Sequence, residues 1–180
     1  MATKKKKGKR LNLKGMISLG VLVLLILIIP ISISNSGYKT VMKNYCKSIV
    51  KQDYEKYKSV FPSVITENGL ESLMLFAYDT GENFMQSKYN SYVEAYGKNV
   101  KISYKINDRT KLSKEELLQY SKSATALCTD GSEINFKKGY TLNITMKYKG
   151  KTSSNEEDVS VIVVKLDGDW YIYDGGIYFC

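Results

Sequence analysis

The sequence predicts an α+β domain carried on a membrane-spanning helix, and three patterns support this fold class. Residues 16–33 contain no charged side chain and are almost entirely aliphatic. Between this apolar run and residue 100, apolar residues recur at helical spacing. After residue 100, apolar residues alternate mostly with polar ones, which is the period of a half-buried strand. An order of helices followed by strands favours helices packed on one face of a curved, mostly antiparallel sheet.

The apolar run has the length and the flank of a transmembrane helix. Eighteen residues at about 1.5 Å each give roughly 27 Å, close to the ~30 Å hydrocarbon core of a bilayer. Seven basic residues and no acidic residue precede it: Lys4, Lys5, Lys6, Lys7, Lys9, Arg10 and Lys14. A short basic flank stays in the cytoplasm. We therefore expect a single-pass protein of the cell membrane, with its N-terminus in the cytoplasm and its C-terminal domain on the extracytoplasmic side.

The net charge of +9 is mainly a topology signal, because the seven cations before Met16 leave only +2 for the rest. We therefore expect membrane lipid, bound through residues 16–33 and the basic tail, as the partner of this part of the chain. Nucleic acid is disfavoured, although Lys-rich tails can bind it.

A cleaved signal peptide is the alternative interpretation. Ser32 and Ser34 follow Pro30 at the spacing of a cleavage site, which would release a secreted domain after a cut near Ser34. The apolar run is longer than the usual ~7–15 residues of such a signal, which favours a retained anchor. The predicted organisation is a tail at 1–15, a span at 16–33, a short linker at 34–37 and one domain at 38–180.

Two helices are predicted at the start of the domain. Tyr38 to Val50 has an apolar face that includes Cys46, and four lysines lie four apart on the other side: Lys39, Lys43, Lys47 and Lys51. This basic stripe would face anionic lipid or an anionic wall polymer, or it is a solvated helix face, which we favour. Asp53 is placed to cap a second helix over Tyr54 to Phe61, which Pro62 stops.

Two more helices are predicted before the first strand. Thr66 to Phe76 has a helical pattern weakened by Gly69. Glu82 to Tyr96 has a continuous apolar face, and Gly97 supplies its C-terminal stop.

A strand, a helix and a turn are predicted next. Val100 to Ile106 alternates as a half-buried strand. Ser113 and Glu116 form a capping box for a helix that runs to about Leu127, with Leu117 and Leu118 expected to be buried. Thr129 to Ser132 then reads as a turn.

An antiparallel meander completes the prediction. Tyr140 to Tyr148 alternates as a strand with one wet face. Glu157 to Leu166 is apolar on both sides, which is typical of a central, doubly covered strand. Asp167 and Gly168 form a two-residue type I′ hairpin signal, and Asp169 to Asp174 returns.

Two segments resemble the nuclear-transport-factor-2-like (NTF2-like, or cystatin-like) superfamily, namely DYEKYKSVFP at 53–62 and VSVIVVKLDGDWYIYD at 159–174. The likeness covers most of residues 38–174. The combination of an anchor and such a domain resembles small membrane-anchored extracytoplasmic proteins of low-GC Gram-positive bacteria. It implies a cone-shaped domain with a pocket between the first helix and the sheet. It implies no particular chemistry, because the fold hosts enzymes, binders and scaffolds.

The residues that could carry chemistry are few. The chain has no histidine, and its three cysteines form no CxxC pair. Enzymes that the resemblance suggests, of the steroid-isomerase and polyketide-cyclase type, use an Asp base. The acidic residues of the domain have structural contexts instead: caps or turns at Asp53, Asp79, Asp108, Asp130, Glu115, Glu116, Asp167 and Asp169, and a consecutive run at 156–158. We therefore assign no catalytic, cofactor or metal residue and expect no cofactor.

Three cysteines in an exported domain allow one disulfide. Cys46 reads as a core residue, whereas Cys128 and Cys180 lie at element ends. A Cys128–Cys180 bond is the expected pairing if one forms, and three reduced thiols are the alternative.

The sequence favours a membrane-anchored extracytoplasmic binding or scaffold module without catalysis, partnered by other envelope proteins or by itself, as in secretion or conjugation assemblies. The alternative is a small-molecule binder or enzyme that uses the pocket. A filled cone with an exposed apolar patch favours the first function. A hydrophobic pocket with a desolvated carboxylate favours the second.

Overall fold

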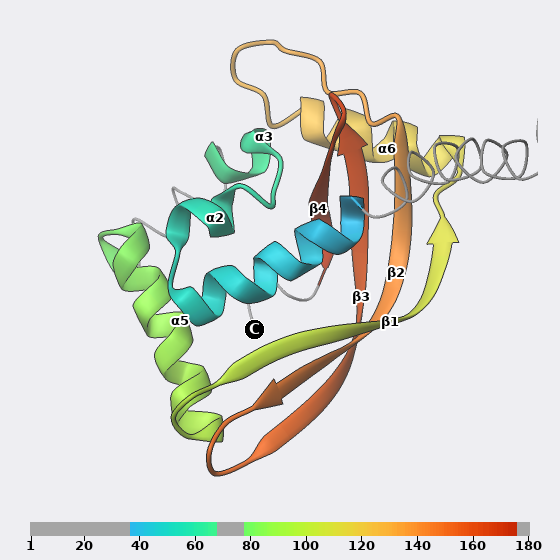
Figure 1. The fold of residues 1–180 in the computed structure, drawn as a ribbon. Helices are drawn as coiled ribbons and strands as arrows, with labels where there is room; N and C mark the ends of the chain where they lie inside the picture. The colour runs from blue at the N-terminus through green and yellow to red at the C-terminus, as the bar shows by residue number, and fades with distance from the viewer. Residues whose placement is uncertain (1–36, 68–77, 176–180) are drawn as a thin grey trace, which may run out of the picture. The chain divides into compact units, whose positions relative to one another are not determined.

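A computed structural model of the chain describes residues 37–67 and 78–175 (Figure 1). The chain divides between Ser36 and Gly37 into two units, and all described residues belong to the second. The predicted basic tail at 1–15 and span at 16–33 lie outside the described residues. Within the described part, no helix is long and apolar enough to cross a membrane.

A four-stranded antiparallel sheet with the order β1-β2-β3-β4 forms the centre of the domain. Its strands are β1 (Lys101–Lys111), β2 (Lys138–Lys149), β3 (Ser154–Leu166) and β4 (Asp169–Gly175). The predicted α+β class and the predicted meander are therefore confirmed. The first strand continues well beyond Ile106, with a register shift between Ile106 and Asp108.

The central strand β3 divides its side chains between two hydrophobic cores. Val161 and Val163 are fully buried in the core that the helical segment 37–51 covers. Ile162 and Val164 point to a second core on the opposite face. The prediction that this strand is covered on both faces is confirmed.

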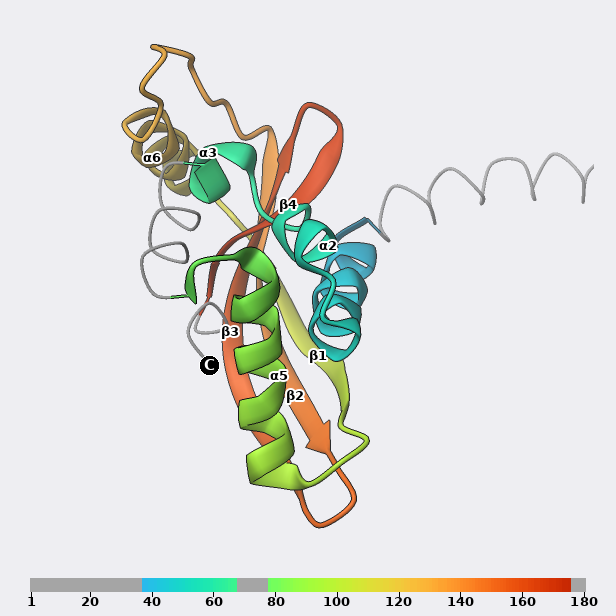
Figure 2. The same ribbon diagram turned by 90° about the vertical axis from the view of Figure 1, so that its left-hand side faces the viewer.

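The first face of the sheet is covered by the helical segment 37–51, by α2 (Tyr54–Lys58) and by α5 (Gly81–Tyr96), which lie in front of the strands in Figure 2. Large side chains fill the space beneath them. Those that are almost completely buried include Met42, Tyr45, Ile49, Tyr57, Phe61, Met85, Leu142, Ile144 and Met146. Cys46 is also in this core, as predicted.

The second face is covered by α6 (Lys114–Thr125), so the expectation that the helices share one face is wrong. The reason lies in the strands: Val164, Tyr171 and Tyr173 alternate with residues of the first core and are themselves apolar or aromatic. A sheet with two apolar faces needs a cover on each of them.

The N-terminus of α6 has the predicted capping box. The Glu116 amide donates to Ser113 Oγ at 3.1 Å, and the Ser113 amide donates to Glu116 Oε2 at 2.7 Å. The expected burial of Leu118 is wrong, because this side chain is 56 % exposed. Leu117, Ser121 and Ala124 face the sheet, and Leu118 lies about 100° around the helix from Leu117.

The second predicted helix, over Tyr54 to Phe61, is shorter in the structure than the apolar pattern suggests, and a separate short helix follows it. Asp53 caps α2 as predicted, with its carboxylate accepting from the Lys56 amide at 2.9 Å. However, α2 ends at Lys58, well before Pro62, and a short α3 (Ser63–Ile65) follows the proline. Most of the helix predicted at 66–76 lies outside the described residues.

Loops attach the helices to the ends and edges of the sheet. The Ile172 amide of β4 donates to the Val60 carbonyl at 2.8 Å, which ties the edge strand to the loop after α2. At the far end, the Tyr96 carbonyl accepts from the amides of Thr152 and Ser153, so the β2–β3 turn closes the C-terminus of α5.

The hairpin between β3 and β4 has the predicted two-residue turn. Asp167 has φ 49° and Gly168 has φ 100°, so both turn residues have the positive φ of the type I′ class.

Candidate functional site

The interior between the helices and the first face of the sheet is filled by tyrosine-rich packing. Tyr45 and Tyr57 are 2 % and 0 % exposed, and their ring centroids lie 5.8 Å apart. Tyr92 of α5 stacks on Tyr148 of β2, with centroids at 5.3 Å. Burial raises the pKa of Tyr45 well above its usual value, and neighbouring Tyr57 raises that pKa further. This interior therefore favours neutral phenols.

One polar atom of this interior lacks a partner. The Tyr57 hydroxyl is buried and makes no hydrogen bond, alone among buried side-chain nitrogen and oxygen atoms of the described residues. Its pKa is raised, first by burial and then by the nearby Tyr92 and Tyr54. Among the described residues no Asp or Glu is fully buried, so no buried carboxylate accompanies this hydroxyl as a base.

The carboxylates lie outside this interior. In the described ranges, Asp53 is half-buried and all other Asp and Glu residues are exposed. Hydrogen bonds with Ser113 lower the pKa of Glu116, and hydrogen bonds from Ser132 lower that of Asp130, which confirms their cap and turn roles. Asp108 differs from its prediction, because it lies in β1 rather than in a turn. No cluster of potential metal ligands occurs among these residues.

A groove of about 750 Å³ runs between α6 and the loop before β2. Its walls combine apolar side chains, including Leu117, Leu118, Ile134 and Phe136, with polar ones. Phe136 is anchored, because its amide donates to the buried Ser121 hydroxyl at 2.9 Å. We call this hollow the α6 groove.

Charged side chains line the α6 groove unevenly. Lys114 and Lys122 on α6 and Lys137 on the loop are its cations, and Glu133 is its anion. No ion pair joins Glu133 to any of these lysines within the part of the chain that the structure describes. The groove therefore presents apolar surface bordered by excess positive charge.

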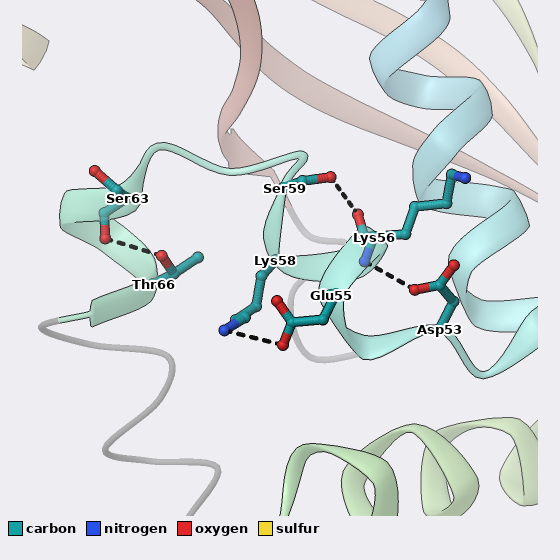
Figure 3. Close-up of polar contacts among 7 residues, drawn as sticks. All are labelled: Asp53, Glu55, Lys56, Lys58, Ser59, Ser63 and Thr66. Atoms are coloured by element: carbon teal, nitrogen blue, oxygen red, sulfur yellow. Dashed lines mark hydrogen bonds and ion pairs between the residues drawn. The ribbon is translucent and has the colours of Figure 1, made fainter.

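A second hollow, of about 430 Å³, lies beside α2 and α3. Figure 3 shows that several of its polar groups are engaged with each other or with nearby backbone: Glu55 pairs with Lys58 at 3.2 Å, and the Ser59 hydroxyl donates to the Lys56 carbonyl at 2.9 Å. The Thr66 hydroxyl likewise donates to the Ser63 carbonyl. These local bonds engage Glu55, Lys58, Ser59 and Thr66 within the chain itself.

The basic stripe lies on the surface of the first helix, as the sequence predicts. Lys39, Lys43, Lys47 and Lys51 are all exposed along the helical segment 37–51. Exposure fits both a lipid-facing and a solvated stripe, so the preference for a solvated face stays a prediction.

The two described cysteines belong to different hydrophobic cores, Cys46 to the first and Cys128 to the second. Cys46 is buried, and burial raises its pKa to about 12. Cys128 is half-buried, with Sγ 3.6 Å from the Ala124 carbonyl oxygen. Cys180 lies outside the described residues, so the Cys128–Cys180 pairing stays a prediction.

The α6 groove was not predicted from the sequence, although one signal pointed to it. Leu117 and Leu118 are adjacent in a capped helix, and adjacent residues of a helix lie about 100° apart. Both leucines cannot be buried on one narrow helix face, so one of them had to be exposed or covered by another segment.

Comparison of the chain with protein-family models, with curated proteins and with solved structures gave no match. Function is therefore inferred from the geometry of the domain itself.

Proposed function

We propose that this chain is a membrane-anchored, extracytoplasmic binding module of NTF2-like architecture that docks a protein partner in the α6 groove and performs no catalysis. The anchor is the predicted span at 16–33, and the basic tail at 1–15 holds the N-terminus in the cytoplasm. The short linker keeps the domain at the membrane surface, which suits assembly with other envelope proteins.

One observation carries the proposal: a large apolar side chain is exposed within a groove, while the described side chains between the helices and the first face of the sheet are packed and buried. Leu118 is 56 % exposed and lines the α6 groove. Exposed apolar surface rimmed by polar residues is typical of interaction sites. The filled, tyrosine-rich interior leaves the alternative, a small-molecule site in the cone, without a buried carboxylate among the described residues.

The chemistry of the groove defines its partner. Apolar walls select aliphatic or aromatic side chains, and Lys114, Lys122 and Lys137 favour carboxylates beside them. The partner is therefore an apolar protein segment with acidic flanks.

A photo-crosslinking amino acid placed at position 118 of the full chain, in intact membranes, tests this function. Leu127 supplies the matched control position, because it is 45 % exposed but does not line the groove. We expect a discrete protein adduct from position 118 and none from position 127. Lys114→Glu with Lys122→Glu should abolish the adduct, because the rim would then repel an acidic segment.

Equal adducts from both positions, or an adduct that survives the charge reversal, would contradict docking in the groove. An increase in mass at position 118 that corresponds to a small molecule would support the alternative binder instead.

A further inference from the structure

The end of the sheet where β1 and β3 finish is also the end where β2 and β4 begin (Figure 1). The strand register places four cations on the first face there. They are Arg109, Lys111, Lys138 and Lys165, and we call this group the basic end. Lys111 is directly opposite Tyr140, a residue of the first core. Lys165 is directly opposite both Lys138 and Trp170, which belongs to the same core. Directly opposite residues of antiparallel strands share a face, so these cations lie on one surface.

The pair Lys138–Lys165 is a like-charge pair without compensation. Both side chains are only half exposed, and like charges directly opposite each other destabilise a sheet. No ion pair connects any cation of the basic end to a carboxylate of the described chain. Elsewhere on the sheet, Lys147 has Glu156 as its partner across the strands. An anion at the basic end would remove the repulsion.

The nearest hairpin carboxylates belong to the other face. Asp167 and Asp169 both act on Tyr171, whose pKa is raised first by burial and then by these two charges. Tyr171 packs in the second core, whereas Trp170 packs in the first. The basic end therefore keeps its positive charge.

Aromatic rings hold two of the cations in place. Arg109 Cζ lies 5.0 Å from the Tyr140 centroid, and its Nη1 donates to the Tyr38 hydroxyl at 2.9 Å. Lys138 Nζ lies 5.4 Å from the same Tyr140 ring, which stacks on Trp170. Positioned cations lose less conformational freedom when they bind an anion.

The chain enters the domain beside this surface. Gly37 lies against the Trp170 indole so closely that a Cβ there would be 2.2 Å from Trp170 Cδ1. Four peptide units separate Gly37 from Ile33, the end of the predicted span, and they reach at most roughly 14 Å. A tether of that length would keep Gly37, and the Trp170 ring beside it, within roughly 14 Å of the end of the predicted span, where the headgroup layer would lie.

We infer that the basic end contacts the phosphates of anionic lipid headgroups and thereby orients the domain on the membrane. This inference depends on the anchor of the proposed function, and it uses a different surface from the α6 groove. The shared chemistry is that of a phosphate anion, and the tether makes the lipid the source.

The experiment reconstitutes the full chain in nanodiscs of phosphatidylcholine, with or without phosphatidylglycerol, and measures acetylation of each lysine by mass spectrometry. We expect Lys138 and Lys165 to react roughly fivefold more slowly when phosphatidylglycerol is present, and high salt to remove this protection. Lys101 and Lys149 are the internal control, because they are directly opposite each other at the far end of the sheet and exposed. Their reactivity should not change.

A matched pair of variants extends the test to Lys111. Lys138→Gln with Lys165→Gln should remove the protection of Lys111, and Lys101→Gln with Lys149→Gln should leave it intact.

Equal reactivity in both lipids, or equal protection of the control lysines, would overturn the inference. Protection by inorganic phosphate in plain phosphatidylcholine discs would overturn it too, because the site would then serve a soluble anion. A chain that does not co-elute with discs refutes the anchor, whereas co-elution without protection refutes only the lipid contact.

Discussion

The Tyr57 hydroxyl is a buried polar group without a hydrogen bond, and its removal should stabilise the domain. An unsatisfied buried polar group costs about 1–3 kcal/mol. Tyr57→Phe keeps the packed ring, so we expect the free energy of unfolding to rise by about 1 kcal/mol in urea titrations.

Tyr104→Phe is the matched control, because the Tyr104 hydroxyl donates to the Lys39 carbonyl at 2.7 Å. This variant should lose about 0.5–1.5 kcal/mol. If both variants are destabilised alike, the Tyr57 hydroxyl must have a partner after all.

Buried acids make the domain sensitive to alkali. The unfolded chain loses the Cys46 thiol proton near the ordinary pKa of 9.0, whereas the folded chain keeps it until about 12. Above pH 9 the folded state therefore binds more protons, and its stability falls by up to about 1.4 kcal/mol per pH unit for this group. Tyr45 and Tyr57 add the same effect above about pH 10.

Urea titrations between pH 7 and 10 measure this loss. Cys46→Ala should be less stable at pH 7 but should lose less further stability between pH 9 and 10, because the contribution of the Cys46 thiol to that loss is removed. A slope identical to that of the unchanged chain would mean that Cys46 ionises freely in the folded domain.

At the scale of elements, the β3–β4 hairpin gives a separate prediction. Gly168 has φ 100°, and no atom lies within 4 Å of an added Cβ, so a substitution there strains the backbone without a clash. Gly168→Val should destabilise the domain by about 1–3 kcal/mol, because β-branched residues resist positive φ. Thermal melting measures the loss.

Gly168→Asn separates the causes, because Asn tolerates positive φ better than Val does. Its loss should be clearly smaller. Equal losses would show that backbone conformation is not the reason.

Elements with strong local signals were predictable, and elements decided by tertiary contacts were not. The caps at Asp53 and Ser113 and the turn at Asp167 depend on neighbours within a few residues, and the structure confirms them. The end of α2 at Lys58 and the second cover of the sheet by α6 depend on distant packing. Leu118 was mispredicted because its burial depends on which helix face meets the sheet.

At the scale of the molecule, topology is the prediction that connects the domain to its function. We expect a membrane-impermeant protease to remove the domain from intact protoplasts, because the predicted topology has the basic tail inside and the domain outside. A cytoplasmic protein in the same cells must stay intact as the control. A protected domain, or a soluble form that begins near Asn35, would contradict the anchor.

The sequence could predict the fold of the domain better than its candidate sites. Periodicity defines strands and helices, so the sheet from β1 to β4 follows from alternation in Tyr140–Tyr148 and its neighbours. The α6 groove and the basic end are each built by residues from separate elements, such as Lys122 with Lys137 or Arg109 with Lys138. Only the register and the packing bring such residues together.

The packing around Trp170 supplies an optical reporter that needs no label. It is the single tryptophan of the chain, and its ring contacts Tyr38 of the helical segment 37–51 and Tyr140 of β2. Its fluorescence therefore originates at the junction between that helix and the sheet. A shift of the emission to longer wavelength would mark exposure of this junction to water, whether the two elements separate alone or with the rest of the domain.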